Sequence, residues 1–274
     1  MKVFISSDME GTAGLVDWDQ CSRNGSQYAY AVELLTAEIN AAIEGAIDAG
    51  ATEFLVNDAH SAMTNLRPDA LAGRARYLSG RYKPMYMMEG LDGTFDAVFL
   101  VSYHGSASSH GSALSHTYYS PAIAEVRIND VVAGESGVNA LVASAYGVPV
   151  SLVTGDQVTA EETRRFCPGV QTAVVKRSVS RYAADSLHPS VATELIRDRA
   201  KTAIDRLGRT PAPAFDSSTD LTVTFRSSDY LELACRIEGV RPAAGLSARI
   251  TAPDPLELYR RFVTVVFLCR SLPG

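Results

Sequence analysis

The stretch that decides the fold runs from residue 2 to residue 58 and contains a strand, a helix and a second strand. Residues 2–11 read KVFISSDMEG, an apolar strand that ends in acidic residues. Residues 28–50, YAYAVELLTAEINAAIEGAIDAG, carry apolar side chains at helical spacing and end in glycine, which is common at helix C-termini. Residues 52–58, TEFLVND, form another apolar strand. This order predicts a parallel sheet covered by helices.

The same alternation continues over most of the chain. We expect further strands over residues 95–103, 122–130, 148–155 and 170–176, and further helices over residues 135–147, 159–167 and 189–208. Residues 209–220, rich in proline, serine and aspartate, predict a loop or linker. Beyond them we expect strands over 221–226 and 232–239, a turn region, and a final helix that begins in PDP at 253–255. The predicted fold class is α/β, a mainly parallel sheet flanked by helices with a smaller C-terminal α/β part.

The composition argues against several classes of partner. The chain has 274 residues, and the 46% that are hydrophobic are enough for a large core. Its net charge is −6 and it lacks a basic patch, so we do not expect it to bind nucleic acid. The longest apolar run, FVTVVFLC at 262–269, is too short for a membrane span, and the apolar residues before Asp8 are too few for a signal peptide. We therefore predict a cytoplasmic protein with no membrane partner.

Acidic and histidine side chains follow the ends of the predicted strands. The five side chains of this kind are Asp8, Glu10, His60, His104 and Glu135. In an extended strand Asp8 and Glu10 would share one face, because residues two apart point the same way. Ligands of open α/β sheets bind beyond the carboxyl ends of the strands. We therefore expect four strand ends to bring these five side chains to one rim of the sheet.

Two imidazoles and three carboxylates form a ligand set that suits zinc, manganese or iron. The four cysteines have no C-x-x-C spacing, which argues against a thiolate zinc site and a disulfide framework. Two divalent ions would carry four positive charges against three carboxylates, and a bridging hydroxide would neutralise the remaining charge. Ions about 3.5–4 Å apart could share that hydroxide as a nucleophile. We predict this metal site in a first α/β domain, residues 1–150, with an approximate boundary to a second α/β domain, residues 151–274.

Individual members of this set also have simpler explanations. Asp8 and Glu10 could belong to a surface turn, and Glu135 could be an acid favoured by the dipole of the helix that it starts. Asp58 is expected to orient His60 or to cap a helix rather than to bind metal. The joint placement of acids and histidines at several strand ends favours the metal site over these separate explanations.

His116 lies outside the strand ends, in a loop rich in serine and histidine at residues 104–121. It could act as a general acid or base, or stabilise an oxyanion, above a metal pair; it could equally be a solvent-exposed loop residue. His110 and His188 are weaker candidates for such a role. The sequence has no G-x-S-x-G nucleophile motif and no glycine-rich phosphate-binding fingerprint, so serine catalysis and nucleotide binding have little support.

Several short motifs occur together in an order and spacing that resemble one known family. They are SSDMEGTAGLVDW (6–18), VNDAHSAMTNL (56–66), YHG (103–105), SHT (115–117), AGESGVNA (133–140) and VTGD (153–156). The chain resembles the DppA-type D-aminopeptidase family of binuclear zinc peptidases over most of its first 190 residues. The elements DMEG and NDAH are specific in combination, although each is short.

The resemblance implies roles for the residues at the matching positions. The positions that match zinc ligands are Asp8, Glu10, His60, His104 and Glu135. Asp8 resembles the bridging carboxylate, and His116 resembles the catalytic histidine. The resemblance further implies two zinc ions, release of N-terminal D-residues from short peptides or amides, and a homo-oligomer that is a decamer in the type member. The chain departs from the family pattern at Ser102, Gly105 and Gln157, which removes no ligand but leaves the substrate preference open.

The predicted function is therefore a metallo-aminopeptidase that hydrolyses short peptides or amides with two metal ions. A metallohydrolase that acts on other amides or on L-peptides would carry the same residues, because side-chain type does not encode the handedness of the substrate. A non-catalytic protein that binds metal or a small ligand as an oligomer is the alternative of a different class. The apolar helix around residues 260–269 could be an oligomer face or could pack within its own chain.

Overall fold

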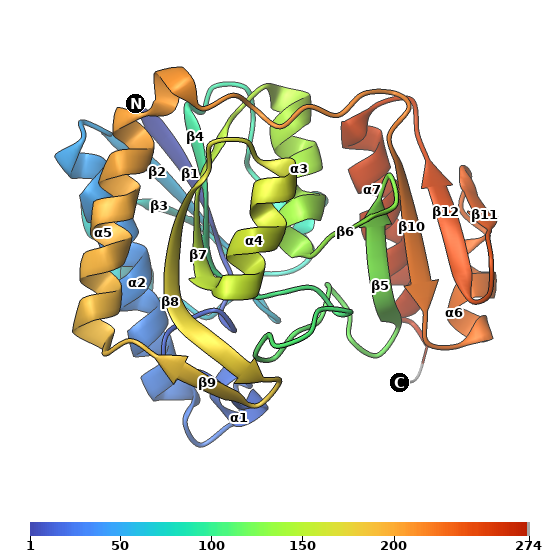
Figure 1. Ribbon diagram of the computed structural model, residues 1–274, viewed down its shortest axis with the longest axis horizontal. Coiled ribbons are helices and arrows are strands. Elements are labelled where there is room, and N and C mark those ends of the chain that lie inside the picture. Colours follow the sequence, from blue (N-terminus) through green and yellow to red (C-terminus); the bar gives the residue numbers. More distant parts are fainter. Residues whose placement is uncertain (273–274) are drawn as a thin grey trace.

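Two β-sheets organise the computed structural model, which describes residues 1–272 (Figure 1). The larger sheet has seven strands in the order β3-β2-β1-β4-β7-β8-β9. Its strands are β1 (Lys2–Ser7), β2 (Glu53–Asp58), β3 (Arg76–Leu78), β4 (Ala97–Tyr103), β7 (Val150–Asp156), β8 (Gln171–Ser180) and β9 (Ala183–Ser186). Only the pair of β8 and β9 is antiparallel. The predicted α/β class with a mainly parallel sheet is confirmed.

Helices cover both faces of the larger sheet. The helices of the described chain are α1 (Trp18–Cys21), α2 (Tyr28–Asp48), α3 (Glu135–Tyr146), α4 (Gln157–Phe166), α5 (Pro189–Asp205), α6 (Ser228–Ala234) and α7 (Pro255–Cys269). Figure 1 shows α2 and α5 together on one face and α3 and α4 on the other. Within residues 1–272, none of them is long and apolar enough to cross a membrane.

The central strand β1 is buried on both faces because it serves two hydrophobic cores. Val3 and Ile5 belong to the core under α2 and α5, whereas Phe4 belongs to the core that includes α3 and α7. This division follows from the alternation of side chains along a strand. It explains why the first strand reads as a continuous apolar run instead of an alternating one.

The parallel register brings three strand ends to one edge of the larger sheet. Ser7, the last residue of β1, lies opposite Asp58 of β2 on one side and Val101 of β4 on the other. The segments that leave these three strands therefore begin side by side. This edge carries the candidate site.

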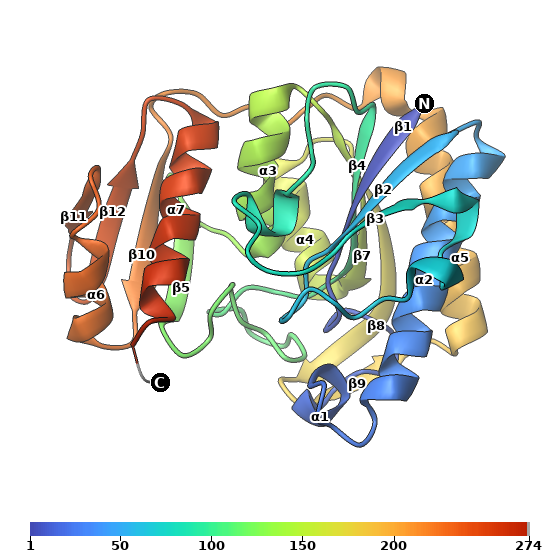
Figure 2. The ribbon, with the colours of Figure 1, turned by 180° about the vertical axis from the view of Figure 1, so that it is seen from behind.

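A second, antiparallel sheet stands beside the first (Figure 2). Its order is β11-β12-β10-β5-β6, and its strands are β5 (Ile123–Ile128), β6 (Val131–Val132), β10 (Asp220–Phe225), β11 (Val240–Pro242) and β12 (Ser247–Thr251). Figure 2 shows α7 packed over this sheet and next to α3. Phe262, Val263 and Val266 of α7 are at most 2% exposed. The apolar face of α7 therefore packs within its own chain, one of the two alternatives considered above.

Two predictions about strands are wrong. The strand predicted over residues 232–239 is the end of α6 followed by turns, and the buried residues Tyr230 and Ala234 show the four-residue spacing of a helix face. The strand predicted over 122–130 exists as β5, but it pairs antiparallel with β10 in the smaller sheet. It therefore adds no strand end to the edge of the parallel sheet.

The two sheets do not separate at residue 150, where the predicted domain boundary lies. β7 and β8 follow that residue and extend the larger sheet, whereas β5 precedes it and belongs to the smaller sheet. β5 and β6 instead belong to the same sheet as the C-terminal strands β10, β11 and β12. The division of the chain into folding domains stays a prediction.

Candidate metal centre

Asp8 and Glu10 lie in a turn just beyond the last residue of β1, not within an extended strand as predicted. The turn is fixed to β4 because Asp8 N donates to Val101 O at 3.0 Å and Gly11 N donates to Ser102 O at 2.8 Å. A side chain at Gly11 would not fit, since its Cβ would lie 2.0 Å from the Tyr103 carbonyl oxygen. This close approach of the turn to the end of β4 directs the carboxylates of Asp8 and Glu10 inward, where these residues are only 3% and 1% exposed.

His60 approaches both acids from the segment after β2. Its Nδ1 is 3.0 Å from Glu10 Oε2 and 3.4 Å from Asp8 Oδ1. Its Nε2 lies 2.8 Å from the Cys21 carbonyl oxygen, which can only accept, so Nε2 carries a proton. Burial opposes a second proton, but the charges of Glu10 and Asp8 outweigh it and raise the pKa of His60 well above its usual range. A cation beside Nδ1 would replace that second proton.

Asp58 holds the loop that carries His60 but does not touch the imidazole. Its carboxylate accepts from the backbone N–H groups of Asn65 and Leu66 and from the Tyr77 hydroxyl. The Asn65 side chain in turn donates to the His60 carbonyl oxygen at 2.8 Å. Asp58 therefore positions His60 through the loop backbone, in agreement with the expectation that it orients His60, and the alternative of a helix cap is not what its side chain provides.

His104 follows β4 and is the most deeply placed imidazole of the group, only 1% exposed. Its Nδ1 donates to the Gly105 carbonyl oxygen at 2.9 Å, which leaves a lone pair on Nε2. That Nε2 lies 3.3 Å from Asp8 Oδ2 and 3.8 Å from Glu135 Oε2. Burial and the neighbouring His116 lower the pKa of His104 to about 3, so its ring is neutral.

Glu135 reaches the cluster from the first turn of α3, which follows the smaller sheet. The prediction that a strand end of the parallel sheet delivers it is therefore wrong, although the side chain arrives at the same place. Its Oε1 accepts from the Tyr118 backbone N–H at 2.7 Å. Burial and the Glu10 charge raise the pKa of Glu135 to about 8, although the hydrogen bond from Tyr118 lowers it in part.

The buried acids and imidazoles fit a bound divalent metal ion. Asp8 Oδ2 and His104 Nε2 face each other at 3.3 Å, and neither has a hydrogen-bond partner in the described chain. A carboxylate oxygen and an unprotonated ring nitrogen are both electron-pair donors, so a cation is what stabilises them at this distance. Burial and the charges of Glu10 and Glu135 also raise the pKa of Asp8 well above its usual range, so a cation beside Asp8 would favour its ionised form.

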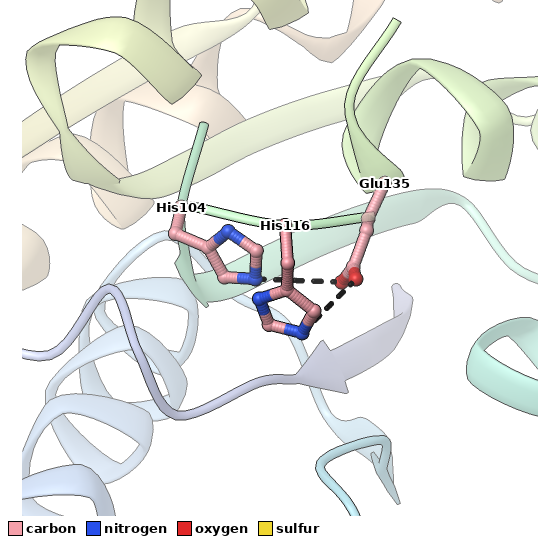
Figure 3. A group of neighbouring side chains, drawn as sticks. All are labelled: His104, His116 and Glu135. Carbon is pink, nitrogen blue, oxygen red and sulfur yellow. Dashed lines mark ion pairs between the residues drawn. The ribbon is translucent and has the colours of Figure 1, made fainter. Parts of the chain in front are cut away.

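His116 joins the cluster from the serine-rich loop (Figure 3). Its ring stacks on that of His104 with centroids 4.3 Å apart, and its Nε2 lies 3.8 Å from Glu135 Oε1. Its Nδ1 is 3.0 Å from the Leu114 carbonyl oxygen, which places a proton on Nδ1 and leaves Nε2 free. Trp18 packs against the ring edge with centroids 5.5 Å apart. His116 is more exposed than the five predicted ligands, which suits a role toward substrate as well as a role toward metal.

Atoms capable of binding metal lie within 4.8 Å of one another in two groups, one of His104, His116 and Glu135 and one of Asp8, Glu10 and His104. The structure therefore brings all six residues singled out in the sequence to one place, with His60 joined through its contacts to Asp8 and Glu10. His110 and His188 are not part of it. His110 is exposed in the loop, and His188 precedes α5 and accepts from Ser190 N.

Lys176 supports the site in a way that the sequence analysis missed. Its side chain is only 1% exposed, and its ammonium group donates to the carbonyl oxygens of Glu10, Thr12 (3.0 Å) and Leu15 (2.7 Å). It therefore fixes the turn that presents Asp8 and Glu10. A lysine at the carboxyl end of the apolar stretch 170–176 is the signal that could have indicated this role, because the carboxyl ends of parallel strands meet at the edge where ligands bind.

A cavity of about 670 Å³ opens beside the cluster. The residues of the cluster that line it are Asp8, Glu10, His60, His116 and Glu135. Three arginines, Arg23, Arg81 and Arg270, line other parts of its wall together with Tyr86 and Tyr119. The volume lies within the range of small-molecule sites, and five of the six residues of the cluster line the cavity. The arrangement can therefore hold a small substrate against metal ions.

Comparisons with known proteins point to one family. The model of the family Peptidase_M55, described as D-aminopeptidase, matches residues 1–264. A D-aminopeptidase of Bacillus subtilis (strain 168) is 35% identical over 269 residues, which are 98% of this chain and 97% of that protein. Among solved structures, the Zn-dependent D-aminopeptidase DppA from Bacillus subtilis, described as a self-compartmentalizing protease, superimposes with a TM-score of 0.94. It is 33% identical, and the match covers 100% of both chains.

Proposed function

This chain belongs to the D-aminopeptidase family Peptidase_M55, and from that membership we propose that it is a zinc-dependent aminopeptidase that releases N-terminal D-residues from short peptides or amides. The observation that carries the proposal is the pair of buried, unpartnered atoms Asp8 Oδ2 and His104 Nε2, which face each other beside an open cavity. A purely structural cluster would satisfy such atoms with hydrogen bonds.

We assign the five predicted ligands to two metal positions. His60 and Glu10 lie on the side of Asp8 Oδ1, and His104 and Glu135 lie on the side of Asp8 Oδ2. Asp8 is thus the carboxylate that would bind both ions, and the other four residues would each bind one. Three carboxylates and two imidazoles are ligands that zinc accepts.

When bound, the two ions would lower the pKa of a bound water to about 7 and polarise the carbonyl group of the substrate. The residues of the chain supply the rest of the chemistry. Asp58 and Lys176 hold the two loops that present His60, Asp8 and Glu10. The cavity is where the peptide would bind, next to the edge of the sheet that carries the metal ligands.

His116 is the residue that we propose as the proton carrier. Its Nδ1–H is fixed to the Leu114 carbonyl oxygen, so Nε2 is the atom that can take a proton and donate it again. Stacking on His104 and the edge contact with Trp18 fix the plane of the ring. From this place Nε2 would donate to the oxyanion of the tetrahedral intermediate or to the leaving amine.

The experiment that tests the proposal combines metal analysis with a substrate screen. The purified protein is expected to contain two equivalents of metal, most of it zinc, and to cleave D-aminoacyl amides and D-dipeptides in preference to their L-counterparts. Treatment with a chelator should abolish the cleavage. Protein that is isolated without metal, and that gains no activity when zinc is added, would contradict the proposal.

A homo-oligomer, with a decamer as the specific expectation, is part of the same proposal. The solved relative is described as a self-compartmentalizing protease, a term for an assembly that encloses its active sites. Large apolar side chains that a partner could cover are exposed in this chain, among them Tyr82 (82%), Val179 (72%) and Tyr182 (56%). Light scattering of the protein as it elutes from a size-exclusion column would give the number of subunits. The cytoplasmic location stays a prediction, and the four free cysteines agree with a reducing compartment.

A further inference from the structure

Arg270 is a half-buried cation on the wall of the cavity, immediately after the end of α7. Its Nη2 donates to the Tyr86 hydroxyl at 2.5 Å and to the Tyr118 carbonyl oxygen at 3.3 Å. The guanidinium carbon also lies 5.4 Å and 5.2 Å from the ring centroids of Tyr86 and Tyr119. Two rings and two hydrogen bonds therefore hold the guanidinium in one orientation.

The guanidinium of Arg270 has no acidic partner within residues 1–272, and its Nε has no hydrogen-bond partner there. By contrast, Arg261, which is also only partly exposed, forms an ion pair with Glu257 at 3.3 Å. A cation that is partly removed from water without an anion is costly, and with both N–H groups of Nη2 donated to Tyr86 and Tyr118, Nη1 is the nitrogen that can donate to a carboxylate. The cavity wall therefore presents a preorganised carboxylate site with no carboxylate from the chain itself.

Arg270 lies close enough to the metal ligand Glu135 for a dipeptide to reach both. Tyr118 contacts both ends of the site, since its N–H donates to Glu135 at 2.7 Å and its carbonyl oxygen accepts from Arg270 at 3.3 Å. One residue of backbone spans roughly 3.5 Å, so Glu135 and the guanidinium are at most about 10 Å apart. An extended dipeptide is about 7 Å long and needs about 3 Å more for a hydrogen bond at its end.

We propose that Arg270 binds the C-terminal carboxylate of a dipeptide substrate, so that the enzyme prefers a peptide bond followed by one residue with a free carboxylate. This assignment rests on the proposed function, because it places the amine and the scissile carbonyl of the substrate at the metal ligands. A longer peptide would place its carboxylate beyond Arg270, and a simple amide has no carboxylate to offer.

Three substrates separate the role of Arg270 in binding from a role in folding. They are D-alanyl-D-alanine, the same dipeptide with a C-terminal amide, and D-alanine amide. The zinc-loaded wild-type protein is expected to show a kcat/KM for the dipeptide about 10- to 100-fold above that for its C-terminal amide, since one charged hydrogen-bonded contact distinguishes them. Arg270→Met should lower kcat/KM for the dipeptide by about the same factor. Its kcat/KM for D-alanine amide should stay within about twofold of that of the wild type.

Two further variants complete the comparison. Arg270→Lys keeps the charge but loses the planar guanidinium that the two tyrosine rings and Tyr118 hold in place. Its kcat/KM for the dipeptide should therefore fall between those of the wild type and Arg270→Met. Arg260→Met, on the exposed face of α7, removes an arginine that pairs with Glu257 and should behave like the wild type on all three substrates.

The outcomes distinguish this assignment from the proposed function. If the wild type hydrolyses the dipeptide and its C-terminal amide equally well, the carboxylate is not recognised and the assignment is overturned. An equal loss on all three substrates in Arg270→Met would overturn it too, because that pattern is the one expected of a structural residue. If the zinc-loaded wild type hydrolyses none of the three, the proposed function fails and the assignment falls with it.

Discussion

Removal of the Asp8 carboxylate should empty both proposed metal positions, whereas removal of the Glu10 carboxylate should weaken mainly one. The prediction follows from the distances in the cluster. The two oxygens of Asp8 face different imidazoles, His60 at 3.4 Å and His104 at 3.3 Å. Glu10 Oε2 lies 3.0 Å from His60, and although Glu10 is also within 4.8 Å of His104, its ion-pair contact is with His60. Asp8→Ala therefore removes a ligand from both positions, and Glu10→Ala removes one from the position beside His60.

The size of the effect can be bounded from the residues that remain. Loss of a residue that only supports a metal ligand typically weakens metal binding by about 10- to 100-fold, so loss of a direct ligand should exceed about 100-fold. In Asp8→Ala this loss applies to both ions. In Glu10→Ala, the position formed by Asp8, His104 and Glu135 keeps its ligands, and its affinity should change by less than about tenfold.

Metal content after dialysis against a weak chelator is the assay. The wild type should retain two equivalents, Glu10→Ala about one, and Asp8→Ala close to none. Glu162→Ala is the matched control, because Glu162 is also a buried carboxylate but, among residues 1–272, accepts hydrogen bonds only from Ser106 N and Oγ, at 3.0 Å and 2.7 Å. It should retain two equivalents. An Asp8→Ala protein that keeps one tightly bound ion would refute the idea that Asp8 binds both.

Three further predictions concern catalysis, pH and the backbone. His116→Ala should lower kcat by about 100- to 1000-fold, about 3–4 kcal/mol, with metal content retained, and loss of metal instead would make His116 a ligand. Burial, against hydrogen bonds from Ala13 N and the Ser102 hydroxyl, raises the pKa of Glu38 to about 7 from 4.5. The folded state therefore binds this proton more tightly than the unfolded state, and the stability it contributes is full below pH 4.5 and lost as the pH rises through 7. The free energy of unfolding of the metal-free protein, measured in urea, should fall by up to about 3 kcal/mol over this pH range. A Glu38→Gln variant whose stability depends on pH as that of the wild type does would disprove this role of Glu38. Gly11→Ala should lower the free energy of unfolding by about 1–3 kcal/mol, since its Cβ would meet the Tyr103 carbonyl oxygen, and an unchanged unfolding midpoint would contradict this contact.

The sequence is sufficient to predict the parallel sheet because its strands are buried on both faces. Such strands read as uninterrupted apolar runs, and the helix between β1 and β2 has clear periodicity and a glycine at its end. The strand ends that carry Asp8, His60 and His104 follow from this pattern, since parallel neighbours end at the same edge.

Other features are not encoded in a local pattern. The apolar letters of residues 232–239 suit a strand or a helix, and packing around Tyr230 and Ala234 makes the segment helical up to residue 234. The alternation in β5 indicates a strand but not which sheet it joins, and this choice depends on β10, almost a hundred residues later. Glu135 was therefore expected from a strand end and arrives from α3. The contacts of Lys176 and Arg270 depend in the same way on segments more than 150 residues away.

A zinc titration of the metal-free protein tests the central claim most directly. The protein is stripped with a chelator, zinc is added in known equivalents, and hydrolysis of a D-aminoacyl substrate and its L-counterpart is measured at each step. We predict no hydrolysis without zinc, and hydrolysis that favours the D-substrate and reaches its full rate at two equivalents per chain. Full activity of the metal-free protein, or a plateau at one equivalent, would contradict a two-metal aminopeptidase.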